Sequence, residues 1–278
     1  MKLRAGLIAV VAVAMMMPCA VAADPVACAR PRGLTMITPP LTRSAERFEA
    51  GQKLVIVAIG SSSTAGAGAS TPTASYPSRL EAELKTRAPG IDIRVINRGK
   101  GGEDAPEELA RLDRDVIAQH PDLVIWQVGT NAILRRDDLS IDAALIRRGV
   151  DMLKNAGIDV VLMDLQYAPL VLDRPGYATM QEIVAEIAEQ AQIGLFRRFA
   201  LMRHWQRADE AGVQMIAADG LHMNDASYGC LAASLADALA SNWGTYVKTA
   251  RSRAVVSESV AGLAAAPRDW PADLLSAY

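Results

Sequence analysis

Residues 54–66 read LVIVAIGSSSTAG, in which six apolar residues lead to a glycine and then to a run of small hydroxyl residues. An uninterrupted apolar run of this length is typical of a β-strand that is covered on both faces. The glycine and hydroxyl residues suit a turn from a strand to a helix, where backbone N–H groups and hydroxyls face a ligand. Three interpretations of this turn stay open on this pattern alone: it holds a nucleophile, it cradles a phosphate, or it binds nothing.

Strand-like and helix-like patterns alternate along the chain from this point. Further strands are expected at residues 91–96, 123–128, 160–165 and 193–196. Helical spacing of apolar residues lies between them, at residues 76–87, 105–119, 141–156 and 177–191. The alternation predicts the α/β class, as a three-layer doubly wound (flavodoxin-like) sheet of about five parallel strands with helices on both faces. Because such a sheet binds ligands beyond the carboxyl ends of its strands, we expect the functional site in the loops that follow the strands.

The beginning of the chain has the pattern of a cleavable secretory signal. Lys2 and Arg4 precede the apolar residues 5–17, and small residues follow at 20–23. The apolar run is too short to span a membrane comfortably. We therefore expect residues 1–23 to be a signal peptide and the mature protein to be periplasmic or secreted, with no stable membrane span after cleavage.

The end of the chain is less regular. A last helix is expected from residue 227 to about residue 247, on the strength of one apolar stripe. The pattern weakens beyond Lys248. Residues 251–278 are either a tail or an extension that lays Trp270, Leu274 and Leu275 on the domain.

Composition excludes several classes of protein. Of the 278 residues, 51% are hydrophobic and 22% are charged, which is typical of a globular protein and not of a disordered or multi-span membrane protein. The formal net charge is −2 with Lys2 and Arg4 included, so removal of residues 1–23, which contain no acid, leaves 29 − 2 = 27 basic against 31 acidic residues. With this balance and no dense run of Lys and Arg, we expect no nucleic-acid partner.

Cysteine and histidine usage bears on disulfides and metals. Loss of the signal removes Cys19 and leaves Cys28 and Cys230, which form one disulfide in an oxidising compartment or stay as two thiols. We predict the disulfide.

The three histidines are widely scattered, whereas a closed zinc site needs about four ligands at short spacings. We expect no metal and no cofactor.

Three later loops carry residues that suit chemistry. Residues 97–102 read NRGKGG, and residues 129–131 place an Asn just past a buried strand. Residues 219–224 read DGLHMN, so that Asp219 stands three positions before His222 and can orient its imidazole. Elimination favours His222 over the other two histidines: His120 lies in a turn at the opposite edge of the predicted sheet, and His204 lies in an expected helix with no acid in the four residues before it.

These four segments, in this order, resemble the motifs of the SGNH (GDSL-type) hydrolase family. The family's first motif, Gly-Asp-Ser-Leu-Thr-x-Gly, aligns on Gly60, Thr64 and Gly66, which puts its nucleophile at Ser62. The resemblance further implies that the oxyanion hole consists of Ser62, Gly102 and Asn131. It implies a base at His222 and its acidic partner at Asp219. On this basis the chain divides into the signal peptide (1–23), an N-terminal extension (24–53), an SGNH-type hydrolase domain (54–250) and a C-terminal extension (251–278).

The sequence departs from the family pattern at three places. Ser61 replaces the acid of the first motif, Ala132 follows Asn131 where an acid is common, and Met223 follows His222 where proline is common. None of these changes removes a group with a catalytic role. They indicate a divergent branch of the family.

The resemblance and the chemistry of these residue types imply the same reaction. A serine hydroxyl becomes a good nucleophile when a base accepts its proton, and His222 held by Asp219 is such a base. We expect a secreted serine ester hydrolase that removes small acyl groups, acetyl foremost, from small-molecule or carbohydrate esters through an acyl-serine. The alternatives are an acyltransferase with the same fold, a relative that binds without turnover, and a flavodoxin-like module that binds flavin or phosphate. The sequence does not indicate an oligomeric state.

Overall fold

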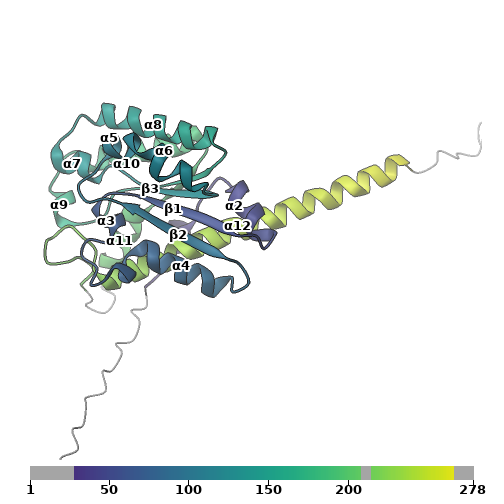
Figure 1. Cartoon of the computed structure of the whole chain (residues 1–278), viewed down its shortest axis with the longest axis horizontal. Coiled ribbons are helices and arrows are strands. Elements are labelled where there is room, and N and C mark those ends of the chain that lie inside the picture. The colour runs from purple at the N-terminus through teal and green to yellow at the C-terminus, as the bar shows by residue number, and fades with distance from the viewer. Residues whose placement is uncertain (1–27, 208–213, 266–278) are drawn as a thin grey trace, which may run out of the picture.

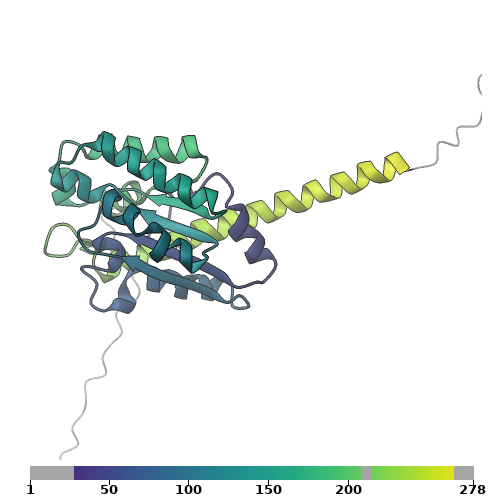
Figure 2. The same cartoon turned by 45° about the horizontal axis from the view of Figure 1, so that its top comes forward.

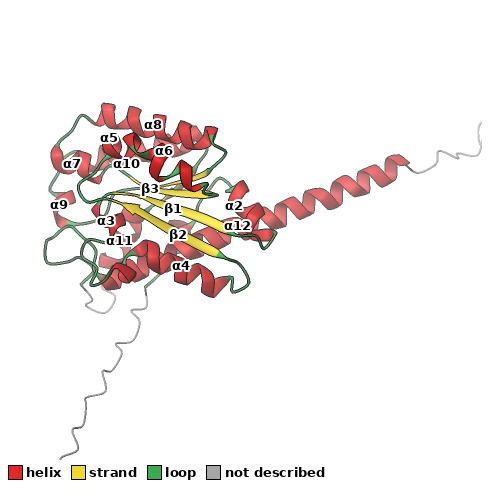
Figure 3. Ribbon diagram, in the orientation of Figure 1, coloured by secondary structure: helices red, strands yellow, loops and turns green. Residues whose placement is uncertain are grey.

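The computed structural model describes residues 28–207 and 214–265. The predicted signal peptide (1–23), Trp270, Leu274 and Leu275 lie outside these ranges. Five strands form one sheet: β1 (Leu54–Gly60), β2 (Ile93–Gly99), β3 (Leu123–Gln127), β4 (Asp159–Met163) and β5 (Gly194–Phe196). Their order is β2-β1-β3-β4-β5 and every neighbouring pair is parallel. The predicted doubly wound α/β sheet is confirmed (Figures 1 and 3).

Helices cover both faces of the sheet. The longer ones are α2 (Thr42–Glu49), α4 (Tyr76–Arg87), α8 (Leu139–Asn155), α10 (Tyr177–Ala191), α11 (Arg198–Arg207) and α12 (Asp225–Ala265). The shorter ones are α1 (Arg32–Thr35), α3 (Ser62–Ala65), η1 (Pro72–Ala74), α5 (Ala105–Ala110), α6 (Leu112–Asp115), η2 (Ile117–Gln119), α7 (Thr130–Arg135) and α9 (Pro169–Leu172). Figure 1 shows α5, α6, α8 and α10 on one face and α4 and α12 on the other.

The alternation of side chains along β1 explains the two covered faces. Ile56 and Ala58 belong to a core that they share with residues of α4 and α12, such as Leu80 and Leu235. Val57 belongs to a second core, with residues of α8 and α10. Because successive side chains of a strand point to opposite faces, an uninterrupted apolar run serves both cores at once.

The helix predicted at 105–119 is broken into α5, α6 and η2. Arg111 leaves the helical conformation, with φ −113° and ψ 5°. Its guanidinium is buried and pairs with Glu103 at 2.6 Å and with Asp115 at 3.5 Å. These buried ion pairs accompany the break, and the apolar spacing of the segment did not indicate it.

The last helix is longer than expected, since α12 runs to Ala265 and not to about residue 247. Figures 1 and 2 show its second half projecting away from the body of the domain, so there is no surface that would require an apolar stripe. No helix among the described residues is both long and apolar enough to cross a membrane.

The predicted disulfide is confirmed: Cys28 and Cys230 are joined, with their Cα atoms 5.6 Å apart. Cys230 lies in the first turns of α12, eight positions after His222. The bond therefore ties the segment before α1 to the helix that follows the histidine loop.

Candidate active site

The turn after β1 contains three consecutive serines that differ in environment. Ser61 and Ser63 are 3% and 1% exposed, and their hydroxyls donate to Gln127 Oε1 at 2.9 and 3.0 Å. Ser62, the first residue of α3, is partly exposed. Of these three hydroxyls, only that of Ser62 is free of the core and open to a substrate.

The loop of residues 219–222, which we call the histidine loop, brings a base to Ser62. His222 Nε2 lies 2.8 Å from Ser62 Oγ, and His222 Nδ1 lies 2.6 Å from Asp219 Oδ2. The other carboxylate oxygen of Asp219 accepts the backbone N–H groups of Leu221 and His222, each at 2.9 Å. Such a turn, closed by an Asp side chain on its own backbone, fixes the carboxylate relative to the ring. Ser62, His222 and Asp219 thus form one continuous hydrogen-bonded chain.

Neighbouring loops hold the histidine loop in place. Gln166, in the loop after β4, donates its side-chain amide to the Leu221 carbonyl at 3.1 Å. Gly68, in the segment after α3, packs against the other side. A Cβ at Gly68 would stand 2.3 Å from the Met223 carbonyl oxygen and 3.0 Å from His222 Cβ, so only glycine fits there without moving the histidine.

Hydrogen bonding keeps Asp219 ionised. Partial burial acts to raise the pKa of Asp219, but the hydrogen bonds from the His222 ring and from the backbone N–H groups of Leu221 and His222 outweigh it. They hold this pKa at about 2. The carboxylate therefore stays negative at any pH at which the enzyme is expected to work.

The other two histidines lie elsewhere. His120 follows η2, shortly before β3 begins, and so lies at the amino edge of the sheet. His204 lies in the last turn of α11. Neither is hydrogen-bonded to Ser62, and His222 is the histidine that the fold brings to the serine.

The predicted oxyanion donors come from the loops beside Ser62. A Cβ at Gly101 would lie 3.9 Å from Ser62 Cβ, which places the glycine-rich loop after β2 against the serine. Gly102 has φ +81°, a conformation that favours glycine. Asn131, in α7, donates its side-chain amide to the Glu103 carbonyl at 2.7 Å and so is fastened to the same loop. The structure therefore gathers Ser62, Gly102 and Asn131 at one end of the sheet.

A buried polar cluster behind Ser62 was not predicted from the sequence. Arg198 is 0% exposed, and its guanidinium donates to Ser63 Oγ and to the Asp164 carbonyl, each at 2.9 Å. Burial raises the pKa of the Asp164 carboxyl to about 7, against the opposing effects of a backbone hydrogen bond from Phe199 and the charge of Arg198. The single polar residues in two apolar runs, Gln127 and Asp164, were a usable signal for this cluster. Arg198 gave none.

A parallel α/β sheet that carries a Ser–His–Asp chain beyond the carboxyl ends of its strands has the architecture of a serine-dependent ester hydrolase. The profile of the non-GDSL lipase-like family matches residues 27–244, and the chain belongs to that family. An arylesterase of Vibrio mimicus is 30% identical over 152 residues, which are 54% of this chain and 72% of that protein. An acetylxylan esterase of Geobacillus stearothermophilus is 41% identical over 56 residues, which are 20% of this chain and 26% of that one.

Solved structures share the fold. A two-domain esterase active on acetylated mannans superposes with a TM-score of 0.62 at 22% identity, and the match covers 76% of this chain and 56% of that chain. The acetylxylan esterase Axe2 of Geobacillus stearothermophilus superposes with a TM-score of 0.56 at 24% identity, covering 67% of this chain and 94% of that one. These structural matches show the fold. The family match and the arylesterase relative identify the chain as a carboxylic ester hydrolase.

Proposed function

We propose that this protein removes small acyl groups, acetyl foremost, from carbohydrate esters, with Ser62 as nucleophile, His222 as general base and Asp219 as the group that orients the base. The observation that carries the proposal is the unbroken pair of contacts Ser62 Oγ–His222 Nε2 (2.8 Å) and His222 Nδ1–Asp219 Oδ2 (2.6 Å). The first contact lies within the range over which a proton is transferred between a nucleophile and its base, and the second is a hydrogen bond that orients the base.

The reaction runs in two steps. Ser62 Oγ attacks the ester carbonyl carbon while its proton passes to His222 Nε2, and Asp219 stabilises the imidazolium that forms. The Ser62 and Gly102 backbone N–H groups and the Asn131 amide stabilise the negative oxygen of the tetrahedral intermediate. His222 then protonates the leaving alcohol, which leaves an acyl group on Ser62. A water molecule, deprotonated by His222, attacks that acyl group, releases the acid and restores the serine.

Two observations support a small acyl group and a carbohydrate alcohol. The segment around the nucleophile consists of Ser, Thr, Ala and Gly, which leave little apolar surface for a long acyl chain. The similar proteins include an acetylxylan esterase and an esterase active on acetylated mannans. The four-motif alignment, with Ser61, Ala132 and Met223 as departures, further supports a divergent member of the SGNH hydrolases.

Export from the cytoplasm is part of the proposal. The charged start, apolar run and small residues of positions 1–23 support a cleaved signal, and the Cys28–Cys230 bond is of the kind that persists in oxidising compartments. A periplasmic or secreted enzyme also has access to acetylated polysaccharide.

The flavin- or phosphate-binding alternative is disfavoured by the serine turn itself. A phosphate cradle needs hydroxyls and N–H groups that face outward, whereas Ser61 and Ser63 direct their hydroxyls inward to Gln127. Only one of the three hydroxyls is left for a ligand.

The test is a series of nitrophenyl esters of increasing chain length, assayed beside acetylated xylo- and manno-oligosaccharides. We expect kcat/KM to fall as the acyl chain lengthens beyond acetate and acetate to be released from the oligosaccharides. A fluorophosphonate should label Ser62, located by mass spectrometry, and should not label Ser61 or Ser63. Preference for long acyl chains would contradict the proposed substrate, and a label on another residue would contradict the mechanism. Acyl transfer to an added sugar in excess of hydrolysis would identify the acyltransferase.

A further inference from the structure

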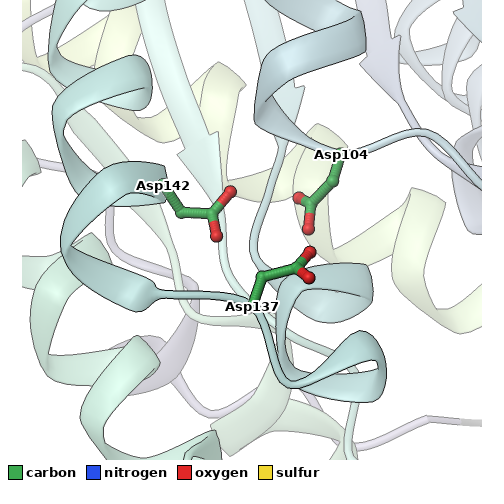
Figure 4. Close-up of side chains that lie close together, drawn as sticks. All are labelled: Asp104, Asp137 and Asp142. Carbon is green, nitrogen blue, oxygen red and sulfur yellow. The ribbon is translucent and has the colours of Figure 1, made fainter.

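Three carboxylates converge beside the proposed oxyanion donors. Asp104 precedes α5, Asp137 lies between α7 and α8, and Asp142 lies in the first turn of α8. One oxygen from each lies within 4.8 Å of the others, and Figure 4 shows the three carboxylates pointing toward a common centre. This is the one group with such spacing that the described part of the chain contains.

The two inner carboxylates are buried with little charge compensation, because the charge of nearby Arg135 only partly offsets the effect of their burial. Asp104 and Asp142 are 2% and 3% exposed. Asp104 uses its side chain to cap α5, yet its Oδ2 atom has no hydrogen-bond partner, and Figure 4 shows the Asp104 carboxylate pointing into the cluster. Among the described residues, no Lys, Arg or His forms an ion pair with any of the three aspartates; the nearby Arg135 pairs with Glu107 instead. Buried carboxylates are normally paired or bound to a metal, so an unpartnered oxygen at this point calls for a cation.

We propose that Asp104, Asp137 and Asp142 bind a calcium ion. All the donors are carboxylate oxygens, which suit a hard cation and not zinc or copper. Calcium binds oxygen at about 2.3–2.6 Å, so two ligands of one ion lie at most about 5.2 Å apart. The three oxygens all lie within 4.8 Å of one another and can therefore contact one ion. Calcium also takes six to eight ligands, about three to five more than the aspartates supply as single donors, and the exposed Asp137 leaves a side open to water.

The position of this site gives the ion a structural role next to the chemistry. Asp104 directly follows Glu103, whose carbonyl accepts the Asn131 amide. Asp137 follows α7, the helix that carries Asn131. A calcium ion would therefore tie the start of α5, the end of α7 and the start of α8 together around two of the proposed oxyanion donors.

The test is a calorimetric titration of the full chain with calcium chloride after chelator treatment, together with thermal unfolding at each concentration. We expect saturable binding of about one ion per chain and a melting temperature that rises with calcium. Asp142→Asn keeps the shape of the side chain and removes its charge, and should weaken calcium binding about tenfold or more, because ligand charge tunes calcium affinity. Asp151→Asn, the same change at an exposed position of the same helix, should bind like the wild type.

A second variant keeps the test valid if Asp142→Asn fails to fold. Asp137→Asn alters an exposed loop and should also weaken calcium binding while leaving the circular dichroism spectrum unchanged. No heat and no shift in melting temperature at about 10 mM calcium chloride, well above the Kd of weak calcium sites, would overturn the proposal. Equal binding by Asp142→Asn and Asp151→Asn would overturn the site, and equal affinity for magnesium would overturn the choice of ion. Ser62→Ala should bind calcium like the wild type, which separates this site from the proposed hydrolysis.

Discussion

Ser44 lies near the amino ends of the strands, which we call the amino edge of the sheet, and Ser62 lies beyond their carboxyl ends, the carboxyl edge. Each serine belongs to a hydrogen-bonded chain that ends on an aspartate. Ser44, in α2, is 0% exposed; it donates directly to Asp159 at 2.7 Å and accepts the Trp243 indole N–H at 2.9 Å. Ser62 is partly exposed, and a histidine stands between it and Asp219. Both chains contain a serine and an aspartate, but the two serines have different roles.

The difference shows what makes a serine reactive. A carboxylate that is bonded directly to a hydroxyl is too weak a base to take its proton near neutral pH, whereas imidazole accepts and returns a proton in that range. Ser44 is also enclosed, so no carbonyl carbon can reach it. The amino edge of the sheet therefore uses serine to satisfy buried polar groups, and the carboxyl edge exposes serine to a substrate.

Ser62→Ala gives the largest expected effect. Removal of the nucleophile should lower kcat by about 10⁴–10⁶-fold, because the remaining groups only bind and polarise the ester. The melting temperature should stay within about 2 °C of the wild type, since the Ser62 hydroxyl satisfies no core group.

His222→Ala should lower kcat to a similar extent, whereas His120→Ala and His204→Ala should retain most activity. Survival of His222→Ala together with loss of activity in His204→Ala would reverse the assignment of the base.

Asp219→Asn should have a smaller effect, about 10³–10⁴-fold in kcat, because the acid orients and stabilises the imidazole without itself moving the proton. The pKa of Asp219, at about 2, lies below the ordinary value for Asp. The contribution of the carboxylate is therefore complete above the ordinary pKa and lost only as the pH falls through the lowered one. The loss of kcat caused by Asp219→Asn should therefore be fully present in a measurement at about pH 8. A variant that keeps the wild-type kcat at that pH would contradict the proposed role of Asp219.

Asn131→Ala should cost about 10²–10³-fold in kcat, which is typical for loss of one oxyanion donor. KM for nitrophenyl acetate should change little, since the developing charge is absent from the bound ester. The same variant also frees the Glu103 carbonyl, so its melting temperature is measured beside kcat as the check for a disturbed loop. If the melting temperature falls together with kcat, Asn131 acts on the loop and not on the oxyanion.

Ser44→Ala tests the amino edge and has the smallest expected effect on rate. It leaves the Trp243 indole N–H without its partner and removes one of the donors to Asp159. Loss of such buried partners costs about 1–3 kcal/mol of unfolding free energy. In a domain of this size each kcal/mol lowers the melting temperature by about 2–4 °C. Denaturant unfolding should show this loss while kcat stays within about twofold of the wild type. A large fall in kcat would remove the distinction between the two edges.

The sheet and the neighbourhood of Ser62 were predictable because both depend on local pattern. A strand covered on both faces has to be apolar throughout, which made residues 54–59 recognisable. In a parallel sheet the loops after the strands meet at one end, which predicted that the turn with Ser62 lies beside Gly102 and Asn131. His222 follows no strand of the sheet and was assigned by elimination and by the family resemblance; its Nε2 atom lies 2.8 Å from Ser62 Oγ.

The features that escaped prediction depend on distant partners. Arg198 is buried and donates to Ser63, 135 positions earlier, and nothing near Arg198 in the sequence distinguishes it from an exposed arginine. The break at Arg111 accompanies an ion pair with Glu103, which lies eight positions earlier and outside the predicted helix. The far part of α12 projects from the domain (Figures 1 and 2), so an apolar stripe could not indicate the full length of this helix.

The bond between Cys28 and Cys230 closes a covalent ring around most of the domain, since 202 positions separate the two residues. During synthesis the ring cannot close until the whole sheet has left the ribosome, because Cys230 lies beyond the last strand. After closure, a single proteolytic nick in any loop inside the ring leaves both fragments attached to each other. Electrophoresis should therefore show one full-length band for the nicked protein without reductant and two shorter bands with it.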